Sequence, residues 1–517
     1  MNFASYLPDL GAIGPELVIA GTILVVLLVD LWRMGRDEAL VWLVAPLVTV
    51  LICLGLFVVG RAANESGPDR PYSLLPEFFG VAGAYALVTI GDVWFRGRDR
   101  WVPGSVLLLG TSIALYRLIL QGCVVFEAGA ATQASYWGSL ITIDGFSVFF
   151  RALALSSLAV CTFFTIFYRP MQSGEGAKGH VEFLTCLAGA HLGAMFLVST
   201  THLLFIFLAL EVLSLSSYLQ SGMLKNDRRS AEAGLKYVIY GSMASGLMLF
   251  GFSLLYAFSG ELTIHVIADY VVATEFEGPE KVLLTLGLLA SLGGFAYKIS
   301  AVPFHFWTPD VYEGSPTPTT AFLSVGSKAA SFGILIRFLA YMVEDQGWMP
   351  KLMQLMAFVA AITMTYGNLA ALRQSNLKRL MAYSSIAHAG YMLMGIVALA
   401  AGYPTVIFYL VAYLLMNLGA FGVIIYLANR TGSEDIDDIR GLGWKAPFVT
   451  GTLVVFLLSL IGLPPTAGFF AKYYLFYEAI NAGFLWLAVI AVINSVISLF
   501  YYFRMAKALF LRFEDEA

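Results

Sequence analysis

The sequence predicts an all-α polytopic membrane protein. Of its 517 residues, 59% are hydrophobic and only 12% are charged, whereas a soluble domain carries roughly 25% charged residues. The mean hydropathy is +0.79. Apolar runs of about 20 residues, the length that crosses the hydrocarbon core as a helix, recur along the whole chain and leave no room for a long soluble domain.

These runs predict about 15 transmembrane helices. Their expected ranges are 14–32, 40–60, 78–95, 104–125, 144–168, 182–200, 202–222, 234–258, 281–299, 318–343, 352–372, 380–401, 404–428, 448–471 and 484–510.

The first two helical hairpins have similar sequences, which favours a duplication. Residues 15–37 and 76–99 both begin with Pro-Glu, later contain Asp-x-Trp and end on Gly-Arg-Asp. Coincidence is the alternative, because short basic turns commonly follow apolar helices.

Lysine and arginine cluster in seven places along the chain, which predicts its orientation. Each cluster follows an odd-numbered helix, and the loops after even-numbered helices hold few basic residues. Because basic loops stay in the cytoplasm, we expect the N-terminus outside and the C-terminus in the cytoplasm. The clusters are Arg33/Arg36, Arg96/Arg98/Arg100, Arg169/Lys178, Lys225/Arg228/Arg229, Arg373/Lys378/Arg379, Arg430/Arg440/Lys445 and Arg504/Lys507/Arg512.

Two predicted helices are broken next to a lysine. Pro303 interrupts the helical pattern after Lys298, and Pro464-Pro465 interrupt it ahead of Lys472. A unit of five crossings reverses its orientation when it is repeated, so breaks at corresponding positions predict two inverted five-helix repeats with sites near the midplane. We therefore expect N-terminal hairpins over 1–142, a linking helix over 143–179, a first repeat over 180–346 and a second repeat over 347–517.

Lys298, Lys328 and Lys472 are the lysines with the most apolar or small neighbours. A lysine at the centre of a membrane helix costs roughly 2.5–3.5 kcal/mol to insert. Because burial penalises a charged ammonium, such a side chain can release and regain a proton, as a proton carrier must. Snorkelling of the ammonium to the membrane surface is the alternative for each of the three.

Glu211 and Lys236 form a second candidate group. Glu211 lies well inside the helix predicted over 202–222, and Lys236 lies near the start of the next long helix. A glutamate and a lysine on adjacent helices can pair and shift each other's protonation, which would make a proton-coupled switch. A purely structural ion pair between the two helices is the alternative.

His305 and His388 are candidate relay groups, because imidazole takes and gives a proton near neutral pH. Hydrogen-bonded packing is the alternative for each.

The sequence contains no nucleotide-binding loop, zinc or haem motif, or Fe–S cysteine set. Cys53, Cys123, Cys161 and Cys186 lack metal or redox spacing, and we expect inert thiols. The net charge of −4 gives no indication of nucleic acid binding. The energy for any transport must then come from an ion gradient or a partner.

Several stretches resemble the antiporter-like membrane subunits of respiratory complex I, and most closely their subunit N group. They are LALEVLSLSSY, EAGLKYVIYGSMASG, FAYKISAVPFHFWTPDVYEGSPTPTTAFLS, NLAALRQSNLKRLMAYSSIAHAGYMLMG and GLPPTAGFFAKYY. The PDVYEG sequence and a lysine at 472 favour subunit N over its sister subunits. The resemblance extends from about residue 143 to residue 510.

The resemblance implies a role for each candidate residue in proton transfer. Glu211 and Lys236 match the acidic and basic pair of the half-channel, and Lys298 matches the lysine on the first broken helix. Lys328 and His388 match the central polar axis. Lys472 matches the lysine on the second broken helix, and His305 matches a histidine of the family motif.

The resemblance also implies a function and partners. The chain would be a translocase subunit that couples quinone reduction elsewhere to proton transfer. We expect no cofactor in this chain, and flavin, Fe–S clusters and quinone in partner subunits. The expected partners are subunits M, J and K, through them the peripheral redox arm, and lipid of a bacterial inner membrane. A subunit of a sodium/proton antiporter, or of a ferredoxin-fed complex, is the alternative.

The sequence departs from the family pattern at both ends. The family has two helices before the DGF segment, whereas about four are predicted here. Its usual last helix is missing after Arg512.

Overall fold

The computed structural model describes residues 102–127, 134–136, 140–171, 179–274, 278–342 and 349–511, together with Gly21 and Phe276. The three helices predicted before residue 100, and the suggested duplication of 15–37 and 76–99, lie outside these residues. The chain divides into two compact units, Met1–Ser216 and Ser217–Ala517. The boundary between them falls within one helix, α8 (Leu203–Ser221).

The first unit contains helices α5 (Val102–Glu127), α6 (Gly145–Phe167) and α7 (His180–Val198), and the first part of α8. Between α5 and α6 the short strands β1 (Ala134–Tyr136) and β2 (Ile141–Ile143) pair antiparallel. The Asp144 carboxylate accepts a 2.7 Å hydrogen bond from the Ser147 backbone, and the Ser147 hydroxyl accepts one in return. This reciprocal cap satisfies donors that the first turn of α6 leaves free. A short helix, η2 (Arg169–Met171), follows α6.

Gly193 allows α7 and α8 to approach closely within the first unit. A Cβ atom at this position would lie 2.5 Å from the backbone nitrogen of Leu213 and 2.8 Å from the carbonyl oxygen of Ala209. Because backbone atoms cannot swing aside, we expect Gly193→Val to destabilise the fold by about 1–3 kcal/mol. Thermal unfolding should show a lower midpoint for this variant. Gly246→Val is the control, since a Cβ there meets nothing within 4 Å, and equal midpoints for the two variants would contradict the close packing.

The second unit continues from the end of α8 with a set of helices that includes the first break. Helix α11 packs along α9 and also contacts α14, and α12 packs against α9 and α16. The helices are α9 (Arg228–Ser259), α10 (Ile264–Ala273), α11 (Gly278–Ile299), α12 (Trp307–Gly314), α13 (Thr317–Phe322), η3 (Leu323–Ser327) and α14 (Lys328–Met342).

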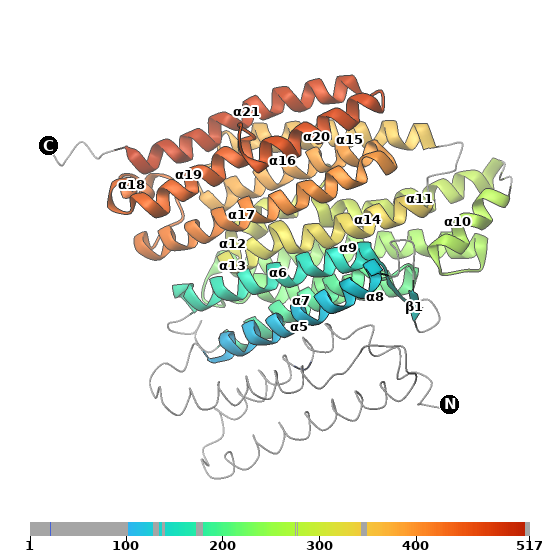
Figure 1. Cartoon of the computed structure of the whole chain (residues 1–517), viewed down its shortest axis with the longest axis horizontal. Helices are drawn as coiled ribbons and strands as arrows, with labels where there is room; N and C mark the ends of the chain where they lie inside the picture. Colours follow the sequence, from blue (N-terminus) through green and yellow to red (C-terminus); the bar gives the residue numbers. More distant parts are fainter. Residues whose placement is uncertain are drawn as a thin grey trace, which may run out of the picture. The chain divides into compact units, whose positions relative to one another are not determined.

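The remaining helices of the second unit include the second break. Helix α15 packs along both α16 and α21, and α17 packs against α19 and α20; Figure 1 shows these helices in orange and red. The helices are α15 (Met349–Ala371), α16 (Leu377–Val397), η4 (Leu399–Ala401), α17 (Tyr403–Thr431), η5 (Asp437–Ile439), α18 (Leu442–Lys445), α19 (Pro447–Ile461), α20 (Ala467–Asn481) and α21 (Leu485–Phe510).

The prediction of an all-α polytopic membrane protein is confirmed for the described residues. In that part of the chain 11 helices are long and apolar enough to cross a membrane, or up to 12 if the bent pair Asp437–Lys445 and Pro447–Ile461 is one span. They follow the segments predicted from residue 104 onward. Large apolar side chains such as Leu219, Met243 and Phe500 are more than 60% exposed, as expected for surfaces that contact lipid.

Both predicted breaks are confirmed. Helix α11 ends at Ile299 and α12 begins at Trp307, while α19 ends at Ile461 and α20 begins at Ala467. The segment predicted as one helix over 318–343 also contains a π-helical turn, η3, which was not predicted. The two inverted repeats and the boundaries at residues 142, 179 and 346 stay predictions.

Two spans of the second unit are surrounded by protein. An 18-residue apolar stretch in each of Thr317–Met342 and Leu377–Val397 is 100% buried, whereas the corresponding stretches of the other described spans are 33% to 72% buried. Polar side chains on these two spans therefore face other helices instead of lipid. In membrane proteins such inward-facing polar groups usually mark an ion or proton path.

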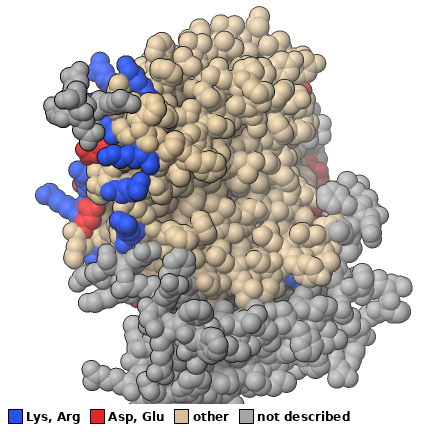
Figure 2. All heavy atoms as spheres, turned by 60° about the vertical axis from the view of Figure 1, so that its left-hand side comes forward, with Lys and Arg blue, Asp and Glu red and all other residues tan. Residues whose placement is uncertain are grey.

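The basic loops of the second unit lie at one end of its helices. Ion pairs and hydrogen bonds link the start of α9 to α12, α12 to the start of α16, and the end of α15 to α21. Figure 2 shows Lys and Arg gathered along one edge, with Asp and Glu among them, beside a broad surface of other residues. This one-sided distribution agrees with the alternation of basic loops in the sequence.

Candidate functional site

The first break places Lys298 in the last turn of α11, where its side chain is 2% exposed. Pro303 has no backbone N–H and cannot continue a helix. At the break Ser300 adopts a positive φ of 64°, and its hydroxyl accepts a 2.8 Å hydrogen bond from Thr308 of α12. The chain therefore leaves α11 directly after Lys298 and is tied back to the next helix.

Aromatic side chains surround the ammonium of Lys298. Its Nζ lies 3.5 Å from the Tyr237 hydroxyl and 5.6 Å from the centre of the Tyr218 ring. The Tyr237 ring stacks on Trp307 at 4.5 Å, and the Trp307 indole donates a 3.0 Å hydrogen bond to the carbonyl of Tyr297. Ring faces stabilise a cation, so the three tyrosine rings favour an ammonium at this position.

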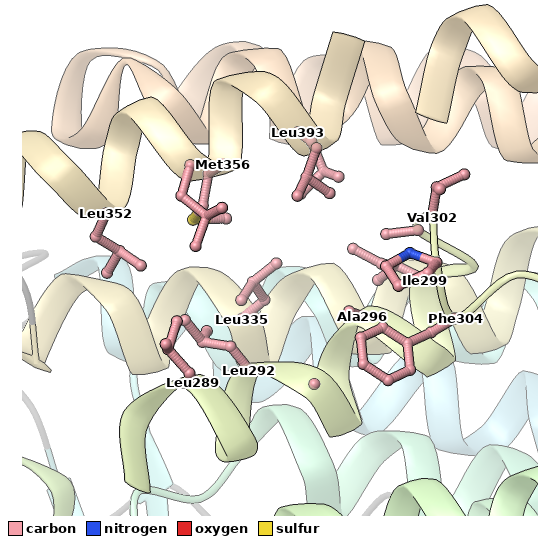
Figure 3. Close-up of a pocket in the computed structure, with 15 residues that line it drawn as sticks. Leu289, Leu292, Ala296, Ile299, Val302, Phe304, Leu335, Leu352, Met356 and Leu393 are labelled. Carbon is pink, nitrogen blue, oxygen red and sulfur yellow. The ribbon is translucent and has the colours of Figure 1, made fainter. Parts of the chain in front are cut away.

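An apolar pocket borders this break. Val302, Phe304, Leu335 and Leu393 are among its lining residues (Figure 3), and none of its 15 lining residues has a polar side chain. The pocket is therefore not part of the polar pathway.

Lys328 begins α14, directly after the π-helical turn, and its side chain is 1% exposed. Its Nζ donates hydrogen bonds of 2.6 Å to both the hydroxyl and the carbonyl oxygen of Ser385 on α16. The Ser385 hydroxyl also lies 3.4 Å from the Tyr312 hydroxyl on α12. Lys328 is thus held between the two buried spans, and snorkelling does not occur.

His388, one turn further along α16, is 1% exposed. Its Nδ1 lies 2.5 Å from the Tyr409 hydroxyl and its Nε2 lies 3.3 Å from the Tyr502 hydroxyl. The Tyr502 hydroxyl also hydrogen-bonds the Ser384 hydroxyl. Both ring nitrogens have hydroxyl partners, so His388 can accept a proton at one nitrogen and release one at the other.

The second break binds Lys472, which lies on α20 and is 4% exposed. Its Nζ donates a 2.8 Å hydrogen bond to the carbonyl of Ile461, the last residue of α19, and a 3.2 Å bond to the Ser495 hydroxyl. The ammonium also lies 4.6 Å from the centre of the Tyr391 ring. A carbonyl that the end of α19 leaves free is thereby satisfied by a lysine.

These contacts join Lys328 to Lys472 along α16. Lys328 bonds Ser385, and the neighbouring Ser384 shares Tyr502 with His388. The rings of His388 and Tyr391 lie 5.8 Å apart. We call the residues Lys328, Ser384, Ser385, His388, Tyr391, Tyr502 and Lys472 the polar axis.

Lys236 is the ninth of the 32 residues of α9, about 12 Å along the helix from Arg228. Its Nζ pairs with the carboxylates of Asp310 at 2.5 Å and Glu232 at 2.7 Å. Asp310 also pairs with Arg379 of α16 at 2.9 Å. Sequence reasoning missed Asp310 and Arg379 as partners, although the acidic pair in PDVYEG on a short helix was the signal that could have found them.

Glu211 lies in the first unit, and its pairing with Lys236 stays a prediction. Its Oε1 is buried with no hydrogen-bond partner among the described residues. A buried carboxylate oxygen without a donor is costly.

His305 lies in the break, apart from the polar axis. Its ring packs against Phe306 at 4.5 Å and Tyr366 at 4.4 Å. Among the described residues no hydrogen bond or ring contact joins it to the lysines of the axis, so its proposed role as a relay stays a prediction. The described residues contain no group of three or more His, Cys, Asp or Glu side chains that could hold a metal.

Residues 200–498 match the family described as "NADH:quinone oxidoreductase/Mrp antiporter, TM". NADH-quinone oxidoreductase subunit N 2 of Chloroherpeton thalassium is 42% identical over 452 residues, which cover 86% of each chain. NAD(P)H-quinone oxidoreductase subunit 2 of a Picosynechococcus species is 42% identical over 451 residues, which cover 86% of this chain and 82% of that protein.

Solved structures share the fold. A chain of respiratory complex I from Thermus thermophilus with bound Aureothin is 33% identical, with a TM-score of 0.65 over 84% of this chain and 89% of that one. A chain of the Mrp complex from Dietzia sp. DQ12-45-1b has a TM-score of 0.68 over 84% of this chain and 79% of that one. Its identity is 23%, so this second likeness concerns the fold alone.

The resemblance read from the sequence motifs is confirmed by these relatives. Their identity extends over more than four fifths of the chain, well beyond the motifs themselves. The chain therefore belongs to the NADH:quinone oxidoreductase/Mrp antiporter family and, within it, to the antiporter-like subunit N group.

Proposed function

We propose that this chain is a proton-translocating membrane subunit of an NADH-quinone oxidoreductase. The observation that carries the proposal is the polar axis, which links buried lysines to a helix break through hydroxyls and one imidazole. Charged groups at this depth are expensive. Buried charged and polar groups on helices that are surrounded by protein are expected of a proton path.

Protons would move by changes of charge on the residues of this chain. Quinone reduction elsewhere in the complex would alter the partner of Lys236, for which Glu211, Asp310 and Glu232 compete. A change of charge there would favour loss or gain of a proton at Lys298. The change of protonation at Lys298 would then alter the protonation of Lys328. From there it would pass through Ser385, Tyr502 and His388 to Lys472.

The chain would work as part of a larger enzyme. It would be a translocase subunit without a redox centre, while flavin, Fe–S clusters and quinone would bind to other subunits. Its neighbours would be subunits M, J and K, which connect it to the peripheral redox arm. We further propose a bacterial inner membrane location with the basic loops in the cytoplasm.

Purification of the chain with its partners tests this function. We expect co-purified proteins that contain flavin and Fe–S clusters, and NADH-driven proton uptake when the complex is reconstituted in vesicles. Proton uptake should collapse with an uncoupler while electron transfer continues. Co-purification with antiporter subunits only, with no flavin or Fe–S protein, would instead support the sodium/proton antiporter alternative. A ferredoxin-dependent rate without an NADH-dependent one would support the other alternative.

A further inference from the structure

Lys378, in the first turn of α16, is a buried charge outside the polar axis. Its side chain is 5% exposed, and its Nζ lies 2.9 Å from the Oε2 atom of Glu434. The same Nζ donates a 2.8 Å hydrogen bond to the carbonyl oxygen of Ser315. Ser315 is the C-cap of α12, so Lys378 satisfies a carbonyl at the end of the helix that follows the first break.

Glu434 lies in the segment that follows α17 and binds the other side of the same turn. Its Oε1 accepts a 3.1 Å hydrogen bond from the hydroxyl of Thr317, the first residue of α13. Its backbone carbonyl accepts a 2.8 Å bond from the nitrogen of Leu377. The pair therefore hydrogen-bonds the chain on both sides of Pro316, at Ser315 and at Thr317. Pro316 itself has no N–H that could donate a hydrogen bond.

Arg379, the residue of α16 that follows Lys378, forms ion pairs with α12. Arg379 pairs with Asp310 at 2.9 Å and with Glu313 at 2.8 Å, and Asp310 is the 2.5 Å partner of Lys236. Because α12 has only 8 residues, a shift of its end at Ser315 moves Asp310 as well. The position of the turn and the Lys236–Asp310 contact are thus mechanically linked.

Stability alone is a weak reason for a pair of this kind. The free energy needed to remove two charges from water is about as large as the free energy gained from their attraction. Apolar residues of the same size are often at least as stabilising. What an ion pair adds is a fixed geometry. Here that geometry joins the segment after α17 to the end of α12, the helix that follows the first break.

We propose that Lys378 and Glu434 are positioning residues that fix the turn between α12 and α13 and thereby set the contact between Asp310 and Lys236. The inference deepens the proposed function, because it assumes that Lys236 takes part in proton transfer. It makes the segment after α17 a determinant of the position of α12 and of the Asp310–Lys236 contact.

Glu434→Gln in the assembled complex tests the proposal with two readouts. Deuterium exchange of peptides over 310–322 should become about tenfold faster, because a charge-assisted anchor of the turn is lost. The proton-to-electron ratio in vesicles should fall about twofold or more. Asp438→Asn is the matched control, because Asp438 is exposed on the same segment and its change removes the same charge. It should leave both readouts at wild-type values.

The double variant Lys378→Met with Glu434→Gln separates positioning from charge balance. Neither charge is left unpaired, so the complex should assemble even if Glu434→Gln alone does not. Deuterium exchange of the peptides over 310–322 should still be rapid, and the proton-to-electron ratio should stay low. Wild-type exchange in the double variant, or exchange in Glu434→Gln equal to that of Asp438→Asn, would overturn the proposal. Rapid exchange with a normal ratio would also overturn it. A Lys298→Ala complex that pumps normally would count against the proposed function instead, whatever the exchange result.

Discussion

Replacing Lys298 with alanine is expected to slow proton translocation by the assembled complex by about 100-fold or more. Lys298 is 2% exposed and lies among the rings of Tyr218, Tyr237 and Tyr297. Alanine offers no group that can bind a proton at this position. The measurement is the initial rate of proton uptake into vesicles that contain the purified complex, corrected for the amount of assembled complex.

Two further variants separate proton transfer from the presence of a charge. Lys298→Arg keeps the positive charge, but a guanidinium does not release its proton, so we expect the same loss. Lys281→Ala removes an exposed lysine near the start of α11 and should leave the rate unchanged. Normal uptake by Lys298→Ala, or full recovery in Lys298→Arg, would show that no proton passes through this side chain.

Replacing Lys472 with methionine is expected to have two effects, one on transport and one on stability. The side chain keeps its length but loses the ammonium that binds the carbonyl of Ile461 at 2.8 Å and the hydroxyl of Ser495 at 3.2 Å. Proton uptake should fall by about 100-fold. The free carbonyl at the second break should lower the stability by about 1–3 kcal/mol, which thermal unfolding of the complex would detect.

Lys445 provides the matched control for Lys472. It lies on α18 and is exposed, so Lys445→Met should change neither proton uptake nor the unfolding midpoint. If Lys472→Met lowered only the midpoint, the lysine would be a structural cap of α19 and not a proton carrier. If it changed neither quantity, the contacts at the second break would be irrelevant to both.

Much of the site could be predicted because the cost of a charge in lipid depends on local sequence. Lys298, Lys328 and Lys472 are conspicuous among apolar neighbours, and the prolines that follow Lys298 and precede Lys472 predict a break. All three lysines are buried in the structure. The Asp310–Lys236 contact was missed because it joins residues 74 positions apart. Nothing in the sequence around Lys236 or around Asp310 indicates that Lys236 pairs with Asp310 instead of with Glu211.

The sequence by itself determined the class of the protein, the order of its helices, the two breaks and the candidate lysines. Each of these follows from hydropathy, proline chemistry or charge, which act within one turn or one span. Only the tertiary structure decided that Ser385 binds Lys328, that the carbonyl of Ile461 binds Lys472, and that Lys378 and Glu434 grip the turn around Pro316. Those contacts join separate helices and loops, and hydrogen bonds of this kind depend on packing geometry that no single segment encodes.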